Sequence, residues 1–449
     1  MLLRSSGRLW AAVAGALLVV AYIGALAWAL QTQSYNIWGS MLLVPALVAV
    51  NIPLLVAAGR RESDSWFARL ILYAFGLKLV GSAARYAVAY LFYDGYADAL
   101  GYSRFASAWH DMWRAGMVVW EVPDDGVTGT AFIRLVTTAL YTVIGPSAIG
   151  GFLVFASFAF WGTYFMYRAF RIAVPEGDHR RYALLIFLLP SVLYWPSSIG
   201  KEAWLMFWIG MVALGAAKFY ARQRGASILL AAGLIGTLMV RPHFAALLVA
   251  GLVLGQLLRP RGGQAIDILP KVAGAVLMVA AGWVVAGHSA AFLGIDELSF
   301  ENVQTEIDTA SKNTEQGGSE FEPVPLTSPA GLPASFVTVL FRPFPWEAHN
   351  LQVMMSALEG LALLVLFALS WRRLRRLPGL LRSHPYLIFS LGYVLLFVWA
   401  FSGFGNFGIL TRERVLVFPF LLVFAALPKV PPGPTTGSGK RQETEGAHA

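Results

Sequence analysis

The sequence predicts an all-α membrane protein, a bundle of about twelve transmembrane helices with interfacial helices on the outer side. Three observations support this fold class. The 449 residues are 57% hydrophobic and only 13% charged, whereas a soluble domain has about 25% charged residues. Apolar stretches long enough, or nearly long enough, to cross a bilayer recur along the chain. Lysine and arginine are concentrated in alternate links between these stretches.

The first expected span, residues 9–30, follows Arg4 and Arg8. It is longer than the roughly 7–15 apolar residues of a signal peptide, so we expect it to be uncleaved. Residues 131–145 are also apolar, but a span there would place the next arginine-rich link outside, so we expect an interfacial or re-entrant helix. The other spans are expected near residues 38–58, 70–93, 150–170, 182–194 and 203–219, as two spans that meet at 241–243, as one that ends near 290, and near 351–370, 386–401 and 414–427.

The charge distribution predicts the orientation, because arginine-rich links usually face the cytoplasm. We expect residues 1–427 to form a transmembrane domain in a bacterial inner (cytoplasmic) membrane, with both termini inside. The outer loops would be 94–128 and 291–350, and residues 428–449, rich in Pro, Gly, Thr and Lys, would be a disordered cytoplasmic tail. The basic residues of the expected inner links are Arg60, Arg61, Arg69, Arg168, Arg171, Arg180, Arg181, Lys218, Arg222, Arg224, Arg259, Arg261, Lys271, Arg372, Arg373, Arg375, Arg376 and Arg382.

The composition also excludes several functions. The net charge of +9 does not indicate nucleic acid as a partner, because the basic residues occupy short links, where they set topology and contact anionic membrane lipid. The chain has no cysteine, which excludes a disulfide, a thiolate nucleophile and a cysteine-ligated metal. The seven histidines are scattered, and no pair has the spacing of metal ligands on one helix.

Two carboxylates, Asp94 and Asp98, follow the third expected span. They are four residues apart and would share one face if this stretch is helical. Desolvation near the membrane boundary suits a carboxylate to general-base catalysis. Asp94 and Asp98 are therefore the candidate catalytic residues and the candidate ligands for a divalent cation. The alternative is a solvated loop with helix-capping aspartates.

A helix start is expected within residues 195–202, between the fifth and sixth spans. A proline followed by Ser197 and Ser198 is typical of a helix N-terminus. The free N–H groups of that terminus, with Lys201 in the first turn, are suited to a phosphate. The alternative is a capped interfacial helix on which Lys201 and Glu202 are solvated.

Basic residues on the expected outer side form a third group. The positive-inside bias does not explain them, and arginine binds anionic oxygens through two parallel hydrogen bonds. The alternative is structural ion pairs such as Arg342 with Glu347 or Arg412 with Glu413. Besides Lys201, the candidate phosphate-binding residues are Arg241, His243, Arg342, Arg412 and Arg414, with Glu347 and Asn350 as supporting residues near Arg342.

Charged residues also occur within the expected spans. Lys78 and Arg85 are seven residues apart and share one face of the third span. Such charges usually face protein or a wet cavity, although long side chains can also snorkel to the interface. Glu359, in the tenth span, is a candidate partner. Lys78 and Arg85 are therefore supporting site residues, as are Ser197, Ser198 and Glu202.

Residues 92–170 resemble the GT-C class of integral membrane glycosyltransferases. An Asp-bearing outer loop with interfacial helices follows an early span, and a late outer loop contains aromatic residues and arginine. Further segments resemble uncharacterised bacterial polytopic proteins grouped with these enzymes, namely residues 195–202, 241–243, 341–347 and 406–414. The resemblance implies a GT-C-like fold, a polyprenyl-phosphate-linked sugar as donor, and Asp94 as the catalytic carboxylate.

The sequence therefore predicts a glycosyltransferase of cell-envelope assembly that moves a sugar from this donor to a glycan or lipid acceptor on the outer side. A second interpretation is an O-antigen or exopolysaccharide polymerase or ligase that acts on a lipid-linked oligosaccharide and depends on arginines more than on Asp94. A third is a transporter or flippase of a lipid-linked or anionic substrate, which would have broken helices and internal repeats. Pro190 and Gly236 are the sequence features that hint at broken helices.

Overall fold

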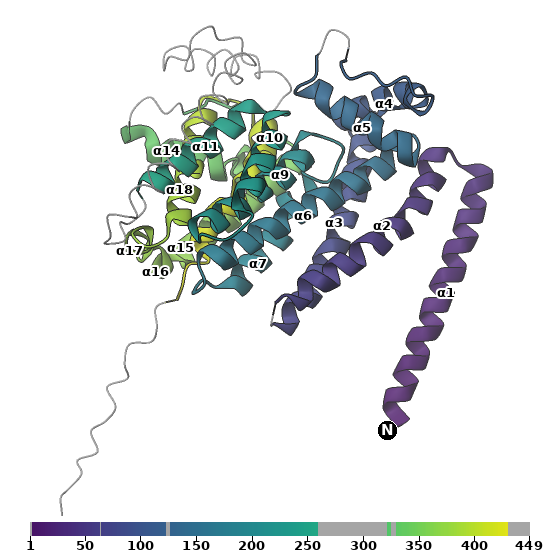
Figure 1. The fold of residues 1–449 in the computed structure, drawn as a ribbon, viewed down its shortest axis with the longest axis horizontal. Helices are drawn as coiled ribbons and strands as arrows, with labels where there is room; N and C mark the ends of the chain where they lie inside the picture. Colours follow the sequence, from purple (N-terminus) through teal and green to yellow (C-terminus); the bar gives the residue numbers. More distant parts are fainter. Residues whose placement is uncertain (1, 63, 123–125, 259–320, 325–328, 430–449) are drawn as a thin grey trace, which may run out of the picture.

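The computed structural model describes residues 2–62, 64–122, 126–258, 321–324 and 329–429. These residues form helices and no strand (Figure 1). Six helices are long and apolar enough to cross a membrane. The structure is thus all-helical and compatible with a multi-pass membrane protein. The six are α1 (Leu2–Thr32), α2 (Tyr35–Arg60), α3 (Ser65–Leu91), α6 (Ala148–Ala173), α9 (Lys201–Tyr220) and α15 (Leu351–Leu369).

Most other expected spans correspond to shorter helices. Twelve crossings remain a prediction, and the expected ninth span lies outside the described residues. The shorter helices at expected spans are α7 (His179–Leu188), α8 (Pro190–Tyr194), α10 (Ala226–Leu238), α11 (Pro242–Leu257), α18 (Pro385–Phe401) and α20 (Phe418–Ala425). The remaining elements are α4 (Asp98–Arg114), α5 (Thr130–Ile144), η2 (Pro329–Gly331), α14 (Leu332–Phe341), η3 (Pro345–Glu347), α16 (Trp371–Leu374), α17 (Leu377–Leu381), α19 (Phe407–Glu413) and η4 (Arg414–Leu416).

The expected fifth span is not one continuous helix. Leu189 separates α7 from α8 and has an extended backbone, with φ −62° and ψ 123°. The physical reason is Pro190, because a proline ring disfavours helical geometry in the preceding residue and removes one backbone N–H donor. The chain therefore bends within this apolar segment, just before the turn that leads to α9.

The arginine-rich links and the links expected on the outer side lie at opposite ends of the bundle. The buried carboxylate of Glu62, after α2, binds Arg168 and Arg171 of α6, each at 2.8 Å. At the same end, Asp178 binds Arg373 at 2.8 Å. The hairpin of α4 and α5 lies at the other end, away from α16 and α17 (Figure 1). The segregation of links that the sequence predicts is therefore present in the fold.

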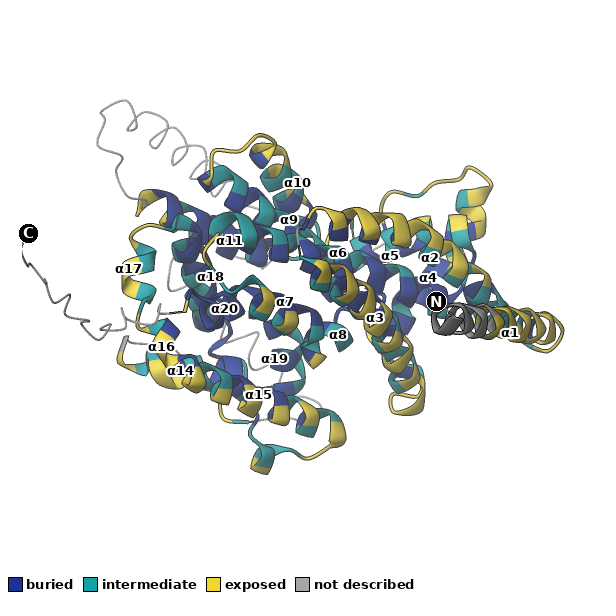
Figure 2. Cartoon of the chain, turned by 90° about the horizontal axis from the view of Figure 1, so that it is seen from below, coloured by how far each residue is buried: buried dark blue, intermediate teal, exposed yellow. Residues whose placement is uncertain are grey.

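Burial divides the helices into an inner and an outer group. Figure 2 shows exposed residues along α1, whereas α20 is buried throughout. In the inner group, α6 and α9 approach closely where Gly162 and Gly210 meet, because a Cβ on either glycine would collide with the backbone of the other helix. Close approach through small residues is characteristic of helix packing in membranes. Exposed apolar side chains on α1, α2 and α3 are suited to contact with lipid.

Candidate functional site

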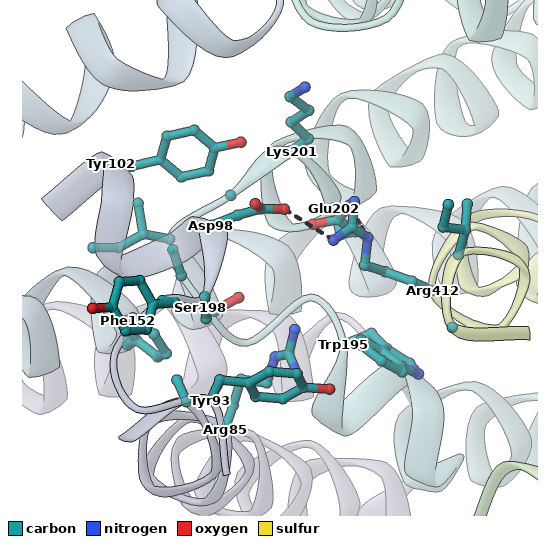
Figure 3. Close-up of a pocket in the computed structure, with 18 of the residues that line it drawn as sticks. Arg85, Tyr93, Asp98, Tyr102, Phe152, Trp195, Ser198, Lys201, Glu202 and Arg412 are labelled. Carbon is teal, nitrogen blue, oxygen red and sulfur yellow. Dashed lines mark hydrogen bonds and ion pairs between the residues drawn. The ribbon is translucent and has the colours of Figure 1, made fainter. Parts of the chain in front are cut away.

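A cavity of about 360 Å³ lies at the end of the bundle that holds the α4–α5 hairpin. It is bounded by the C-terminal end of α3, the start of α4, the turn before α9, the start of α15, and α19. Its charged and polar lining residues include Arg85, Tyr93, Asp98, Tyr102, Ser198, Lys201, Glu202, Gln352, Asn406 and Arg412, several of which are labelled in Figure 3. Helices from the first and last parts of the chain thus meet at one hollow.

α9 begins at Lys201, within the stretch where the sequence predicts a helix start, but the preceding residue is Gly200 and no serine side chain caps the helix. Ser197 donates a hydrogen bond to the carbonyl of Leu193 at 2.5 Å, so it supports the backbone and is not free for a ligand. Ser198 and Lys201 line the cavity. The expected helix start is therefore confirmed, and it lies where an anion could reach its first turn.

An ion-pair cluster closes one side of the cavity. Nη1 of Arg412 lies 3.2 Å from Oδ2 of Asp98, and its Nε lies 3.0 Å from Oε1 of Glu202. Behind them, Arg241 pairs with Glu413 and lies 3.6 Å from Glu202. In Figure 3 the carboxylate of Asp98 points toward Glu202 and Arg412. Four segments that are remote in the sequence are joined by this cluster.

Electrostatics keep this cluster charged. Glu202 raises the pKa of Arg412, an effect that burial opposes and Asp98 reinforces. Burial lowers the pKa of Arg241 to about 10, although Glu202 opposes the shift. Burial, with smaller contributions from Asp98 and Glu202, raises the pKa of Tyr102 to about 12. At neutral pH both guanidinium groups are therefore cationic, and Tyr102 keeps its phenolic proton.

Two further cations line the cavity without a carboxylate partner. Among the described residues, no carboxylate lies within ion-pairing distance of Arg85 or Lys201. Arg85 donates to the hydroxyl of Tyr194 at 3.2 Å and lies 4.6 Å from the ring centroid of Trp195. Lys201 extends away from the ion-pair cluster in Figure 3. The cavity wall thus offers two cations that could bind an anionic ligand.

The two candidate aspartates are placed differently. Asp98 is the first residue of α4, whereas Asp94 lies in the preceding turn, is exposed, and is not part of the cavity lining. The two aspartates would share one face only on a continuous helix, and this condition is not met, because Asp94 and Gly95 adopt φ values of 45° and 79° between α3 and α4. The pair does not fit a shared cation site either, since Asp98 binds Arg412 and Asp94 lies outside the cavity.

Several predicted phosphate-binding residues lie outside the lining. Arg342 binds Glu347, with Nε 3.0 Å from Oε1, and lies over the ring of Phe321 at 4.7 Å. Arg414 is fully buried and donates to the carbonyl of Arg342. The alternative of a structural Arg342–Glu347 pair is therefore the observed one.

Asn350, a predicted supporting residue, and His243, a predicted phosphate-binding residue, each lie at the start of a helix. Asn350 accepts a hydrogen bond from the N–H of Val353 at 2.9 Å and caps α15. His243 is in the first turn of α11, next to Arg241, and its ring lies 5.1 Å from that of Phe244. Neither residue is in the cavity lining.

Sequence reasoning missed some of the lining. Tyr102 is one helical turn beyond Asp98, and this spacing on α4 could have identified it. Asn406 caps α19 by accepting from the N–H of Ile409 at 3.2 Å, and its position depends on a contact between distant segments. Gln352, which accepts from the hydroxyl of Tyr93 at 3.1 Å, gave no sequence signal for the same reason.

No family model matches the chain, and neither a curated protein nor a solved structure matches it.

Proposed function

We propose that the protein is a membrane glycosyltransferase that moves a sugar from a polyprenyl-phosphate-linked donor to a glycan or lipid acceptor at the outer face of a bacterial inner membrane. One observation carries the proposal. The carboxylate of Asp98 faces the same cavity as Arg85 and Lys201, two cations without a carboxylate partner among the described residues. A base beside an anion site is what transfer of a sugar from phosphate to a hydroxyl requires.

The proposed roles follow from these positions. Asp98 accepts the proton of the acceptor hydroxyl, whose oxygen attacks the anomeric carbon of the donor sugar. The bond between that carbon and the phosphate oxygen breaks, and the lipid phosphate leaves with the electron pair. Arg85 and Lys201 stabilise the departing phosphate, because cations are most effective where negative charge develops. Of the two aspartates, Asp98 is preferred because it lines the cavity, whereas Asp94 does not.

The transporter interpretation is supported by one feature, the break between α7 and α8. Two backbone groups of α8, however, are bound by protein side chains, the N–H of Ser191 by Glu359 and the carbonyl of Val192 by Lys78. They are thus not open to a transported ion. The break is therefore compatible with a transferase as well as with a transporter. The carboxylate of Asp98 in the same cavity as Arg85 and Lys201 favours the transferase.

A reconstitution experiment tests the proposal. The purified protein in lipid nanodiscs is incubated with a polyprenyl-phosphate-linked sugar that carries a radiolabel in the sugar, together with extracted cell-envelope glycan. We expect the label to move to the acceptor and free polyprenyl phosphate to appear in equal amount. A donor that binds but is never cleaved, and that instead crosses the membrane of sealed proteoliposomes, would favour the transporter.

A further inference from the structure

Two buried ionisable side chains, one basic and one acidic, reach the same short helix, α8. Nζ of Lys78, on α3, donates to the carbonyl of Val192 at 2.6 Å. Oε2 of Glu359, on α15, accepts from the backbone N–H of Ser191 at 2.7 Å. Both side chains are buried, with Lys78 2% and Glu359 8% exposed. The sequence suggested that these two residues pair with each other, but each binds the backbone of α8.

The break explains why these charges are needed. An interrupted helix leaves N–H groups at the start of the new segment and carbonyl groups at its end without helical partners. In a nonpolar surrounding each unsatisfied group costs several kcal/mol, so such groups must find partners within the protein. A carboxylate suits the N–H of Ser191 and an ammonium suits the carbonyl of Val192. The acceptor Glu359 and the donor Lys78 therefore match the polarity of the α8 backbone.

α8, whose backbone Glu359 and Lys78 bind, continues directly into the cavity wall. The next residues after α8 include Trp195, Ser198 and Lys201, all of which line the cavity. On α3, Gly81 packs so closely against the carbonyl of Leu193 that a Cβ would collide with it. One turn later, Arg85 of α3 binds Tyr194. A single face of α3 thus follows this segment from the break to the cavity.

We propose that Lys78 and Glu359 are positioning residues that hold α8, and through it the turn before α9, in the geometry that forms the cavity. Buried charges in membrane helices are usually assigned to substrate binding or proton transfer. Here Nζ of Lys78 and Oε2 of Glu359 each bind a backbone group of α8, so we assign these side chains to fixing the cavity wall. The inference concerns the shape of the site and does not depend on which substrate the site takes.

A cysteine reporter tests this role in the otherwise cysteine-free chain. Ser198→Cys places a thiol in the cavity wall, and Ser390→Cys places one at a fully buried position of α18. The rate of modification by a small methanethiosulfonate is measured for each reporter in the purified full-length protein, in three backgrounds. Glu359→Leu removes the acceptor, Glu359→Gln retains an acceptor oxygen, and Lys78→Met removes the donor.

We expect Glu359→Leu and Lys78→Met to change the Ser198→Cys rate by about tenfold or more, because each leaves a buried backbone group unpaired. Glu359→Gln should stay within about threefold of the parent, since an amide oxygen still accepts from Ser191. The Ser390→Cys rate should not change in any background. Equal effects of Gln and Leu would overturn the inference, as would parallel changes at both reporters or no change at Ser198→Cys. If Lys78→Met does not accumulate, the two Glu359 variants decide the question.

Discussion

Arg412 is the residue through which the candidate base is connected to the protein interior. It bridges Asp98 of α4 and Glu202 of α9, and Glu202 in turn lies near Arg241. The side chain of Asp98 is 68% exposed and that of Glu202 only 9%. Glu202 therefore serves as a buried anchor for Arg412, while Asp98 remains accessible to an acceptor.

Asp98→Asn should lower the rate of sugar transfer by about 10²–10⁴-fold, because the amide keeps the shape of the side chain but cannot accept the proton. Folding should be nearly unaffected, since an exposed ion pair contributes little to stability. The measurement is release of polyprenyl phosphate by the reconstituted protein. Asp94→Asn is the matched control and should retain most activity; a loss confined to Asp94→Asn would return the catalytic role to that residue.

Arg85→Gln and Lys201→Gln should each weaken binding of the lipid-phosphate donor by roughly ten- to a hundredfold, the usual effect of losing a charge-assisted contact. Donor affinity is measured by titration of the protein in nanodiscs. Arg342→Gln is the control, because Arg342 is paired with Glu347 outside the cavity and its loss should affect thermal stability but not affinity. An affinity loss in Arg342→Gln alone would show that the anion binds beside Arg342 and Glu347 and not in the cavity.

The charged residues of the site could be predicted in part. The proline and two serines before Lys201 are a local signal that predicts a helix start, and α9 does begin at Lys201, although neither serine caps it. The place of Asp94 could not be predicted, because it depends on a left-handed turn that the flanking residues do not specify uniquely. Arg412 and Arg414 are only two residues apart in the sequence, and it is the packing of α19 and η4 that places Arg412 in the cavity wall and buries Arg414.

Among the elements, the long helices could be predicted from the sequence. For the fifth span, the position of the interruption could be predicted, but the side chains that bind its backbone could not. Apolar length specifies a helix such as α3 or α6, because a nonpolar environment forces the backbone to bond to itself. Pro190 signals a possible kink, but the partners that satisfy the break, Lys78 and Glu359, come from segments about 110 residues before it and 170 residues after it. Such partners are a property of tertiary packing.

Gly210→Ala should destabilise the protein by about 1–3 kcal/mol, because its Cβ would collide with the backbone of α6 at Gly162. The readout is thermal unfolding in one fixed detergent. Gly76→Ala in α3 is the matched control, since no neighbouring atom lies within 4 Å of its Cβ and alanine is the better helix former. Equal unfolding temperatures for the two variants would show that the α6–α9 contact is not tightly packed.

At the scale of the whole molecule, the arginine-rich links lie at one end of the bundle and the cavity lies at the other. α3, α9 and α15 each have one terminus at the cavity and the other at the end where Glu62, Asp178 and their arginine partners lie. This arrangement could be predicted from the sequence, because insertion retains arginine-rich links on one side. How the helices pack around the cavity could not, because it depends on contacts between distant segments.

The orientation can be tested directly with single cysteines in the cysteine-free chain. Thr128 is exposed in the link between α4 and α5, and Ser383 is exposed in the arginine-rich link before α18. The positive-inside bias predicts that Thr128→Cys is labelled by a membrane-impermeant maleimide in intact cells, and that Ser383→Cys is labelled only after permeabilisation. Both sites are exposed, so a difference reports sidedness and not burial. The reverse pattern would place the cavity on the cytoplasmic side, where nucleotide-activated sugars are available, and a lipid-linked donor would then no longer be favoured.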